Sequence, residues 1–560
     1  MEKKWWQEAI VYQIYCKSFC DTNGDGIGDL QGVISKLPMI KELGANCIWF
    51  NPIYKSPQVD NGYDISDYQD IDPAYGTLEE FKELLDKAHS MGIRVVMDLV
   101  LNHTSDEHKW FQESRKSKDN PYRNYYVWRA PKENGKEPNN WGNYFYEGKG
   151  SAWEYDELTG EYYLHNYSKK MPDVNWEYEP LRQEMYKMMC WWLDLGVDGF
   201  RLDAINRLKK PAGLPDSKMP PAPPVGIHGY VVDRAICTNV PGIHELLRTI
   251  NKNAWSKYDC MTVGECGNLS SDGALDYISQ GNKEIDMLFH FEIGKNPKII
   301  TVNEYKETQQ RWIDLMKHNA WISQFLTNHD TPRQVSRFGN DQEYRVPSAK
   351  LLATLTHTMP GTPFVYQGEE IGMTDVYFET IDDYDERYTV GKYWTMVEAG
   401  EDPKAALDKL RAMSRDNART PYQWDDSTNA GFTTGKPWIK VNPRYTEINY
   451  AADRASSDSI FDYYKALLSL RKTHPAIIDG EFQFLLMDHP QVVMYLRKCA
   501  RETMLVVCNF SDETVNVEIP EELNGYKWNR ILANYPETEP SLEGRAQWKP
   551  WEAEIYTIEL

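Results

Sequence analysis

The sequence predicts an α/β fold built on a (β/α)8 TIM barrel, with an inserted subdomain after strand 3 and a C-terminal antiparallel β-sandwich domain. Short apolar, β-branched and aromatic runs alternate with amphipathic helical segments, and this alternation is typical of a parallel barrel. Two stretches interrupt the alternation, one from residue 104 to about 170 and one after about residue 480. The chain has 560 residues, which is too long for one ordinary core, so two or three domains are expected.

Eight runs are candidates for the barrel strands. They lie at residues 11–15, 47–50, 94–100, 199–203, 261–265, 287–291, 322–327 and 363–368. The intervening segments 78–91, 181–195 and 243–257 carry apolar residues at helical spacing, so we expect helices there.

The two interruptions set the expected domain limits. Residues 104–170 are rich in Trp, Tyr, Asn and Gly and lack a long helical pattern, which favours an inserted subdomain. After residue 480, the runs 492–496, 505–509 and 514–519 indicate strands of a β domain of roughly 80 residues. We therefore expect a barrel at 1–103 and 172–480, an inserted subdomain at 104–171, and a C-terminal β domain at 481–560.

Composition excludes several classes of partner. The net charge is −22, which repels nucleic-acid phosphates and anionic membrane surfaces but not a neutral substrate. No apolar run of about 18 residues and no signal peptide is found, and the nine cysteines lack zinc-type spacing. Free thiols in the cytoplasm are therefore expected. Aromatics make up 13% of the residues, a fraction compatible either with sugar stacking or with a large buried core.

Acidic residues stand at the ends of three predicted strands: Asp203, Glu265 and Asp330. The loops after barrel strands converge on one mouth, where catalytic residues of this architecture lie. A single acid at a strand end is more often a helix cap or a surface residue, but acids at three strand ends favour a common site. The segment 98–103, which ends in His103, closes the third strand in the same way.

Cleavage of a glycosidic bond requires acids of this kind. One carboxylic acid protonates the leaving oxygen, and a second carboxylate attacks the anomeric carbon or activates water. Arg201 and Asp203 alternate on one strand, so Arg201 is expected to hold Asp203 ionised. Glu265 ends an apolar strand, where desolvation is expected to raise its pKa as a general acid requires.

The strand-end segments 98–103, 199–203, 264–265 and 328–330 occur in an order that resembles the α-amylase family of glycoside hydrolases. Tyr63-Asp64 and the segment 415–424 add to the likeness, which covers nearly the whole chain and points to the oligo-1,6-glucosidase and α-glucosidase branch. The resemblance implies a retaining exo-α-glucosidase with Asp203 as nucleophile, Glu265 as acid/base and Asp330 as transition-state stabiliser.

The same resemblance implies a set of substrate contacts. The residues expected to bind the terminal glucose are Asp64, His103, Arg201, His329 and Arg415, with Tyr63 as a stacking platform and Phe145 as an aromatic wall. Arg419 competes with Arg415 for its role, since both lie in one motif. An ion pair between Asp64 and Arg415 is expected to close the pocket, so that it takes one sugar unit of a short oligosaccharide or disaccharide α-glucoside.

A few residues that differ from the common pattern of this branch bear on substrate preference. Ala204 follows the nucleophile, where Ala or Thr resembles α-1,4-selective members and Val resembles α-1,6-selective ones; one such contact is worth only about 1–3 kcal/mol. The Pro-rich loop 209–224 either shapes the entrance or is an ordinary surface loop. Rival functions are a sucrose-acting transglucosylase or isomerase, and a trehalose-6-phosphate hydrolase with Lys209 and Lys210 at the rim.

A non-enzymatic relative acting as a binding subunit is the rival from another class. Such a protein is expected to have lost one of the three acids and often to carry a membrane segment. The chain retains Asp203, Glu265 and Asp330, so an active enzyme is the favoured reading.

A metal loop is predicted near the N-terminus, at residues 21–29. Oxygen-bearing residues alternate with glycines there, as at the start of an EF-hand loop, which suits Ca²⁺ or Mg²⁺ in a structural role. The alternative is an Asx-rich turn without a metal. The expected ligands are the side chains of Asp21, Asn23, Asp25 and Asp29, and the carbonyl of Ile27.

Overall fold

An eight-stranded parallel sheet forms the core of the computed structural model, which describes residues 3–148, 150–220, 229–293, 301–537 and 542–559. The predicted fold class is confirmed. The strand order is β11-β10-β9-β5-β2-β1-β13-β12. The strands are β1 (Val11–Ile14), β2 (Cys47–Phe50), β5 (Arg94–Val100), β9 (Gly199–Asp203), β10 (Met261–Glu265), β11 (Met287–Phe289), β12 (Ser323–Gln324) and β13 (Thr362–Tyr366).

All eight predicted runs therefore contain a barrel strand, although β12 is only two residues long. The first and last strands of the sheet, β11 and β12, approach each other and nearly close the barrel. The hydroxyl of Ser323 donates a hydrogen bond of 2.7 Å to the carbonyl of Leu288 across this seam. Except for Arg94 at the start of β5 and Glu265 at the end of β10, the strand residues are buried, which explains their nearly continuous apolar sequences.

The three predicted helices are also present: α3 (Leu78–Ser90), α5 (Glu179–Leu195) and α6 (Ile243–Asn253). Helix α3 begins at a capping box in which Thr77 and Glu80 satisfy each other's backbone amides. Helix α6 ends earlier than expected, because Ala254 leaves helical geometry and a short 3₁₀ turn, Trp255–Lys257, follows it.

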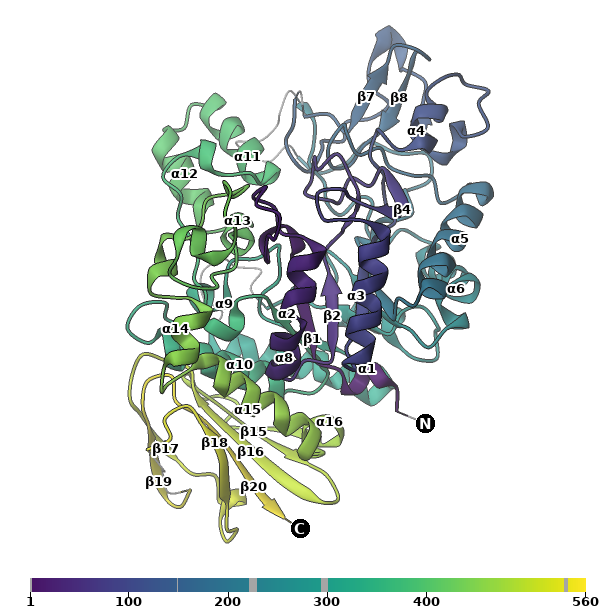
Figure 1. Cartoon of the computed structure of the whole chain (residues 1–560). Coiled ribbons are helices and arrows are strands. Elements are labelled where there is room, and N and C mark those ends of the chain that lie inside the picture. The colour runs from purple at the N-terminus through teal and green to yellow at the C-terminus, as the bar shows by residue number, and fades with distance from the viewer. Residues whose placement is uncertain (1–2, 149, 221–228, 294–300, 538–541, 560) are drawn as a thin grey trace.

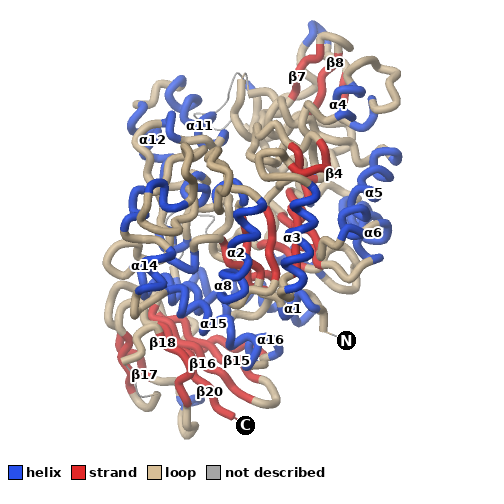
Figure 2. The backbone as a smooth tube through the Cα atoms, in the orientation of Figure 1, coloured by secondary structure: helices blue, strands red, loops and turns tan. Residues whose placement is uncertain are grey.

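Between β5 and α5 the chain forms a separate small sheet, with order β6-β8-β7. The strands are β6 (Trp128–Arg129), β7 (Trp153–Asp156) and β8 (Glu161–Leu164), preceded by the short helix α4 (Lys109–Ser114). Figure 1 shows this insertion at one end of the barrel, across from helices α11 (Arg387–Glu398) and α12 (Pro403–Arg411). This end of the molecule consists largely of loops (Figure 2).

The C-terminal strands lie at the opposite end of the barrel from the insertion (Figure 1). A five-stranded antiparallel sheet, β14-β15-β16-β20-β18, accompanies the two-stranded pair β17-β19. The strands are β14 (Glu481–Leu485), β15 (Val492–Lys498), β16 (Glu502–Asn509), β17 (Val515–Glu518), β18 (Asn529–Ala533), β19 (Arg545–Trp548) and β20 (Ala553–Glu559). The three predicted strands correspond to β15, β16 and β17.

Lys306 joins this domain to the barrel. It lies in α8 (Val302–Asp314), is fully buried, and donates to the carbonyls of Leu486, His489 and Val492 at 2.9, 2.7 and 3.3 Å. The domain thus provides the hydrogen-bond acceptors for an ammonium group that the barrel helix carries.

The remaining expectations about the chain can be placed briefly. All nine cysteines lie in the described ranges, and each is a free thiol, as expected. No helix in those ranges is long and apolar enough to cross a membrane. Of the Pro-rich loop 209–224, residues 221–224 lie outside the described residues.

Candidate active site

A cavity of about 330 Å³ opens at the carboxyl ends of the barrel strands. The three predicted acids line it together, although they come from three different strand ends. Its volume is at the lower end of the range typical of small-molecule sites, about 300–1,000 Å³. The predicted residues that line it are Tyr63, His103, Phe145, Asp203, Ala204, Glu265, Asp330 and Arg415.

One guanidinium group holds the carboxyls of this site together. Nη1 of Arg201 donates to Asp203 at 2.8 Å and to both carboxylate oxygens of Asp98 at 2.8 and 3.0 Å. Nη2 of the same residue donates to Glu265 at 2.5 Å. The expected hydrogen bond between Arg201 and Asp203 is therefore present, and it is one of four that Arg201 makes to carboxylates.

Three carboxyls around a single cation cannot all ionise without cost. Burial raises the pKa of Asp203 well above its usual range, Arg201 lowers it, and the charges of Glu265 and Asp98 raise it further. Burial likewise raises the pKa of Asp98, to about 6. Arg201 thus acts on Asp203 in the expected direction, while burial and the two neighbouring carboxyls act against it.

Asp330, unlike Asp203, is surrounded mainly by cationic groups. Its Oδ1 accepts from Arg419 at 2.8 Å and lies 3.3 Å from a nitrogen of Arg415 and 3.3 Å from Nε2 of His329. Burial raises the pKa of Asp330, but the nearby arginines and His329 lower it to well below its usual range. Arg415 and Arg419 thus both contact this carboxylate, and only Arg415 also lines the cavity.

Tyr63 is fixed beneath the cavity by hydrogen bonds of its hydroxyl. That hydroxyl lies 2.7 Å from Nε2 of His329 and 3.0 Å from Asp98, and the two rings stack with centroids 5.6 Å apart. Gln13 donates to Nδ1 of His329 at 2.9 Å. Burial lowers the pKa of His329 well below its usual value, so a neutral ring accepts from Gln13 and donates from Nε2.

His103 and Phe145 form further parts of the wall. Burial lowers the pKa of His103 to about 4, so the imidazole is neutral near pH 7. Its Nε2 is buried and has no hydrogen-bond partner within the described residues. An orphaned polar atom in a cavity wall is costly, and a sugar hydroxyl would satisfy it. The ring of Phe145 packs against Tyr167 at a centroid distance of 5.6 Å.

The expected ion pair between Asp64 and Arg415 is not formed. The fully buried carboxylate of Asp64 accepts instead from the backbone amides of Val59 and Asp60, at 2.8 and 2.9 Å. Arg415 lies 3.3 Å from Asp330 and 3.7 Å from Glu386. Asp64 therefore shapes the loop that delivers Asp60 to the cavity, and Glu386 takes the place expected for Asp64.

Several residues of the cavity wall were not predicted from the sequence. They lie outside the barrel strands, in the segments that connect them, and the set is Asp60, Tyr144, Tyr167, Arg207, Arg234, Gly267, Asn268, Phe291 and Thr331. Arg207 follows Asp203 by four residues, so a charge soon after a strand-end acid was an available signal. Nothing in the local pattern of Arg234 or Asn268 marks either as part of a site.

The predicted metal loop is folded back on its own amides. Asp21 accepts from the amides of Asn23, Gly24 and Gly26, each at 2.8 or 2.9 Å, and Asp25 accepts from Ile27 at 2.8 Å. Asp29 accepts from Thr22 and caps the next helix through Gly32. Across the described residues, no group of three or more His, Cys, Asp or Glu side chains is arranged to hold a metal ion.

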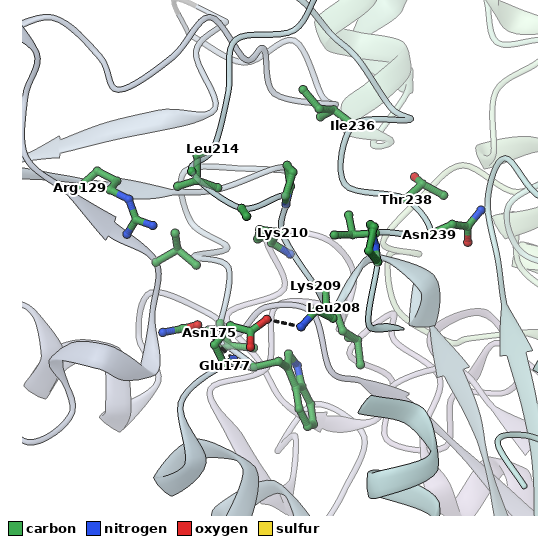
Figure 3. A pocket seen from close by; sticks show the side chains of 18 residues that line it. Arg129, Asn175, Glu177, Leu208, Lys209, Lys210, Leu214, Ile236, Thr238 and Asn239 are labelled. Atoms are coloured by element: carbon green, nitrogen blue, oxygen red, sulfur yellow. Dashed lines mark hydrogen bonds and ion pairs between the residues drawn. The ribbon is translucent and has the colours of Figure 1, made fainter. Parts of the chain in front are cut away.

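A larger cavity of about 760 Å³ lies beside the candidate active site and contains none of the three acids. Figure 3 shows Lys209 and Lys210 in its wall, with Lys209 joined to Glu177. Lys210 pairs with Asp173 at 2.9 Å. These lysines were the basic residues expected at the rim of the active-site pocket in a trehalose-6-phosphate hydrolase. The structure places them in the wall of a different cavity.

Known proteins match nearly the whole chain. Residues 13–480 match the model for the alpha amylase catalytic domain, and residues 482–543 match that for the maltogenic amylase C-terminal domain. The oligo-1,6-glucosidase of Parageobacillus thermoglucosidasius is 49% identical over 570 residues, with 100% of each chain covered. Solved structures of Bacillus licheniformis trehalose-6-phosphate hydrolase and Pseudomonas mesoacidophila trehalulose synthase have TM-scores of 0.90 and 0.92, at 42% and 40% identity, with 100% of each chain covered.

Proposed function

The chain belongs to the α-amylase family of glycoside hydrolases, and we propose that it is a retaining exo-α-glucosidase. Its substrates in this proposal are disaccharides and short oligosaccharides with a terminal non-reducing α-linked glucose. The observation that carries the proposal is the contact of one guanidinium, Arg201, with both Asp203 and Glu265 in the wall of a small cavity.

We assign the two carboxyls the two roles of a retaining glycosidase. Asp203 attacks the anomeric carbon while Glu265 protonates the leaving oxygen, so the C1–O bond breaks as the C1–Oδ bond forms. Water then attacks C1 from the side of Glu265, which takes the proton of that water, and Asp203 leaves as a carboxylate. Glu265 suits the acid/base role because it is the more exposed of the two, with 24% of its side chain accessible against 11% for Asp203.

Asp330 is assigned to stabilising the transition state. Positive charge develops at the sugar ring as the C1–O bond breaks, and an ionised carboxylate in a cavity wall stabilises it. The strongly lowered pKa of Asp330, caused by Arg415, His329 and Arg419 against the effect of burial, keeps that carboxylate ionised. The small volume of the cavity, about 330 Å³, also supports an exo mode of action, because it suits a short substrate rather than a polymer.

Two measurements test this function. When cleavage of 4-nitrophenyl α-glucoside is followed by NMR, α-glucose is expected to be the first product, seen before mutarotation. β-Glucose as the first product would contradict retention. A malto-oligosaccharide substrate is expected to lose one glucose at a time, so an early mixture of internal fragments would contradict exo action.

Two rivals use the same glucosyl-enzyme intermediate. A sucrose-acting transglucosylase or isomerase transfers the glucosyl group to a sugar, and a trehalose-6-phosphate hydrolase differs in its leaving group. Product analysis with maltose, isomaltose, trehalose and sucrose separates hydrolysis from transfer and fixes the preferred linkage. Ala204 favours α-1,4 cleavage in this proposal, by about 1–3 kcal/mol at most.

We also propose that loop 21–29 binds Ca²⁺ or Mg²⁺ as a structural ion, and that the protein works in the cytoplasm, where free thiols persist. Support for the ion is the alternation of oxygen-bearing side chains along the loop. Side-chain oxygens left over from the amide bonds, such as the second carboxylate oxygen of Asp25, would hold it.

Asp25→Asn tests the ion. An amide keeps the hydrogen bond from Ile27 and removes only the charge, so the loop retains its turn. Calcium at saturating concentration is expected to raise the Tm of the wild type by a few degrees and to raise that of the variant much less. If the wild type has the same Tm with calcium and with a chelator, the loop is an Asx turn that binds no metal.

A further inference from the structure

The inserted subdomain contains a cavity of its own, of about 350 Å³, beside strands β7 and β8 (Figure 1). It is about as large as the active-site cavity, and the two have no lining residue in common. We call it the insertion cavity, and the residues of its wall that matter here are Glu147, Glu154, Tyr155, Tyr162, His165 and Lys169.

His165 is the residue of this wall that indicates a ligand. It is only 2% exposed, and neither of its ring nitrogens has a hydrogen-bond partner among the described residues. Burial lowers the pKa of His165 to about 3, although Asp173 and the backbone of Tyr167 act in the other direction. The neutral ring therefore has one N–H donor and one acceptor nitrogen left unsatisfied, at a cost in free energy. A hydroxyl group, which both donates and accepts, would satisfy them.

The charges of the wall disfavour an ionic ligand. Lys169 lies close enough to His165 to lower its pKa, so a metal cation would be repelled there. Glu154 has no cation within 4 Å in the part of the chain that the structure describes, so an anion would be repelled by its carboxylate. Glu147 is already paired with Arg387, at 2.7 Å. These surroundings suit a neutral polar molecule.

Two tyrosines give the insertion cavity an aromatic side. Tyr155 of β7 and Tyr162 of β8 are directly opposite each other in the antiparallel pair, and their rings meet edge to face with centroids 5.1 Å apart. The hydroxyl of Tyr162 donates to the carbonyl of Gly135 at 2.9 Å, which fixes its ring. Tyr155 is 46% exposed, so a ligand can reach it from solvent. An aromatic ring of this kind covers the apolar C–H face of a pyranose.

Two segments of the chain contribute to both cavities. Phe145 and Tyr167 line the active-site cavity, whereas their near neighbours Glu147 and His165 line the insertion cavity. Glu147 also accepts from Ser168 at 2.6 Å, which joins the two segments to each other. The insertion cavity is therefore adjacent to the active site in the fold, although it contains none of the three acids.

We propose that the insertion cavity is a second carbohydrate-binding site, which takes a neutral α-glucosyl unit. His165 bonds a sugar hydroxyl in this proposal, and the exposed ring of Tyr155 covers one face of the sugar. The inference goes beyond the proposed hydrolysis, because a sugar in this cavity is bound without being cleaved.

Binding to a chain whose active site is blocked tests the proposal. An α-configured cyclophellitol aziridine, which esterifies the nucleophile of a retaining α-glucosidase, is attached first, and mass spectrometry confirms one label per chain. The probe is a maltose analogue whose bridging oxygen is replaced by sulfur, so that it resists hydrolysis. Saturation-transfer NMR on the labelled wild type is expected to give saturable binding with a Kd of about 1–10 mM.

His165→Phe keeps a ring of similar size and removes both nitrogens. The Kd of the labelled chain for the probe is expected to rise at least about 10-fold. The Tm without sugar is expected to be unchanged or higher, because these nitrogens have no partner within the described protein. A lower Tm together with an unchanged Kd would show an imidazole that serves only the fold, and would overturn the proposal.

Tyr155→Ala removes the exposed ring and is expected to weaken binding by a similar factor. Because Tyr155 is half exposed, this variant serves if His165→Phe fails to fold. Tyr526→Ala is the matched control, since Tyr526 is 55% exposed and lies in the C-terminal domain, and its Kd is expected to equal that of the wild type.

Two further results would overturn the proposal. One is the absence of saturable binding to the labelled wild type, and the other is binding that neither His165→Phe nor Tyr155→Ala weakens. Failure of the aziridine to attach to the chain would refute the proposed retaining mechanism instead. A labelled chain that binds no probe refutes only the second site.

Discussion

The two ends of the active-site cavity treat charge in opposite ways. Around Asp330, the cations Arg415 and Arg419 have carboxylate partners within the protein. On the side of Gly267, Arg207 and Arg234 also line the cavity, and neither has a carboxylate within 4 Å among the described residues. An end whose charges are already paired suits a neutral glucose, which offers only hydroxyls. Guanidinium groups without carboxylate partners have N–H donors left for oxygens of the leaving group.

The largest effect is expected from replacing the proposed nucleophile, because groups on both sides of the cavity act on the same reaction. Asp203→Asn keeps the size of the side chain and its contact with Arg201 but cannot form the covalent intermediate. We expect kcat to fall by about 10⁴-fold on every α-glucoside, including 4-nitrophenyl α-glucoside, measured by nitrophenol release. Near-normal turnover would end the assignment of Asp203 as nucleophile.

Glu265→Gln is the companion variant, because it separates the two carboxyls by role. The nitrophenolate leaving group needs little protonation, so formation of the intermediate is expected to suffer less with the aryl glucoside than with a disaccharide. Pre-steady-state release of nitrophenol measures that step. Equal losses on both substrates would contradict the role of Glu265 as acid.

A smaller effect is expected from replacing Arg415, which contacts Asp330. Arg415→Gln removes one of the charges that lower the pKa of Asp330, so that pKa rises and the carboxylate protonates at higher pH. We expect kcat/KM to fall by about 100-fold and the acid limb of its pH profile to move to higher pH. An acid limb at the same pH in the variant and the wild type would contradict the part that Arg415 plays in keeping Asp330 ionised.

The smallest effect concerns stability. Burial raises the pKa of Asp60 to about 7, and Arg419 and Arg415 lower it only in part. A carboxyl with a raised folded pKa favours the folded state below its unfolded pKa, and that contribution is lost as pH rises through 7. Asp60→Asn is therefore expected to be more stable than the wild type at pH 8 and to differ little from it at pH 4.5. Urea unfolding at both pH values measures this difference, and a pH-independent difference would contradict the raised pKa.

Strand-end chemistry could be predicted from the sequence because parallel barrel strands deliver their carboxyl ends to one place. Asp203, Glu265 and Asp330 line one cavity for that reason. The positions of Arg207 and Arg234 could not be predicted, because Arg207 reaches the cavity through the left-handed turn at Ala204 and Arg234 lies on a long loop.

The wrong expectations have the same cause. Arg415 lies near the carboxylate of Glu386 and not near that of Asp64. Glu386 belongs to a segment more than a hundred residues after β10. Lys209 and Lys210 follow Asp203 closely in sequence, yet the turn carries them past the active site into the wall of the larger cavity. Position along the chain indicates where a strand ends but not where the following loop directs a side chain.

The buried ammonium of Lys306 has a consequence for the molecule as a whole. Its acceptors are backbone carbonyls of the C-terminal domain, so removing that domain would take three hydrogen bonds away from a barrel helix. A barrel without the C-terminal domain is therefore expected to unfold at a lower temperature than the whole chain.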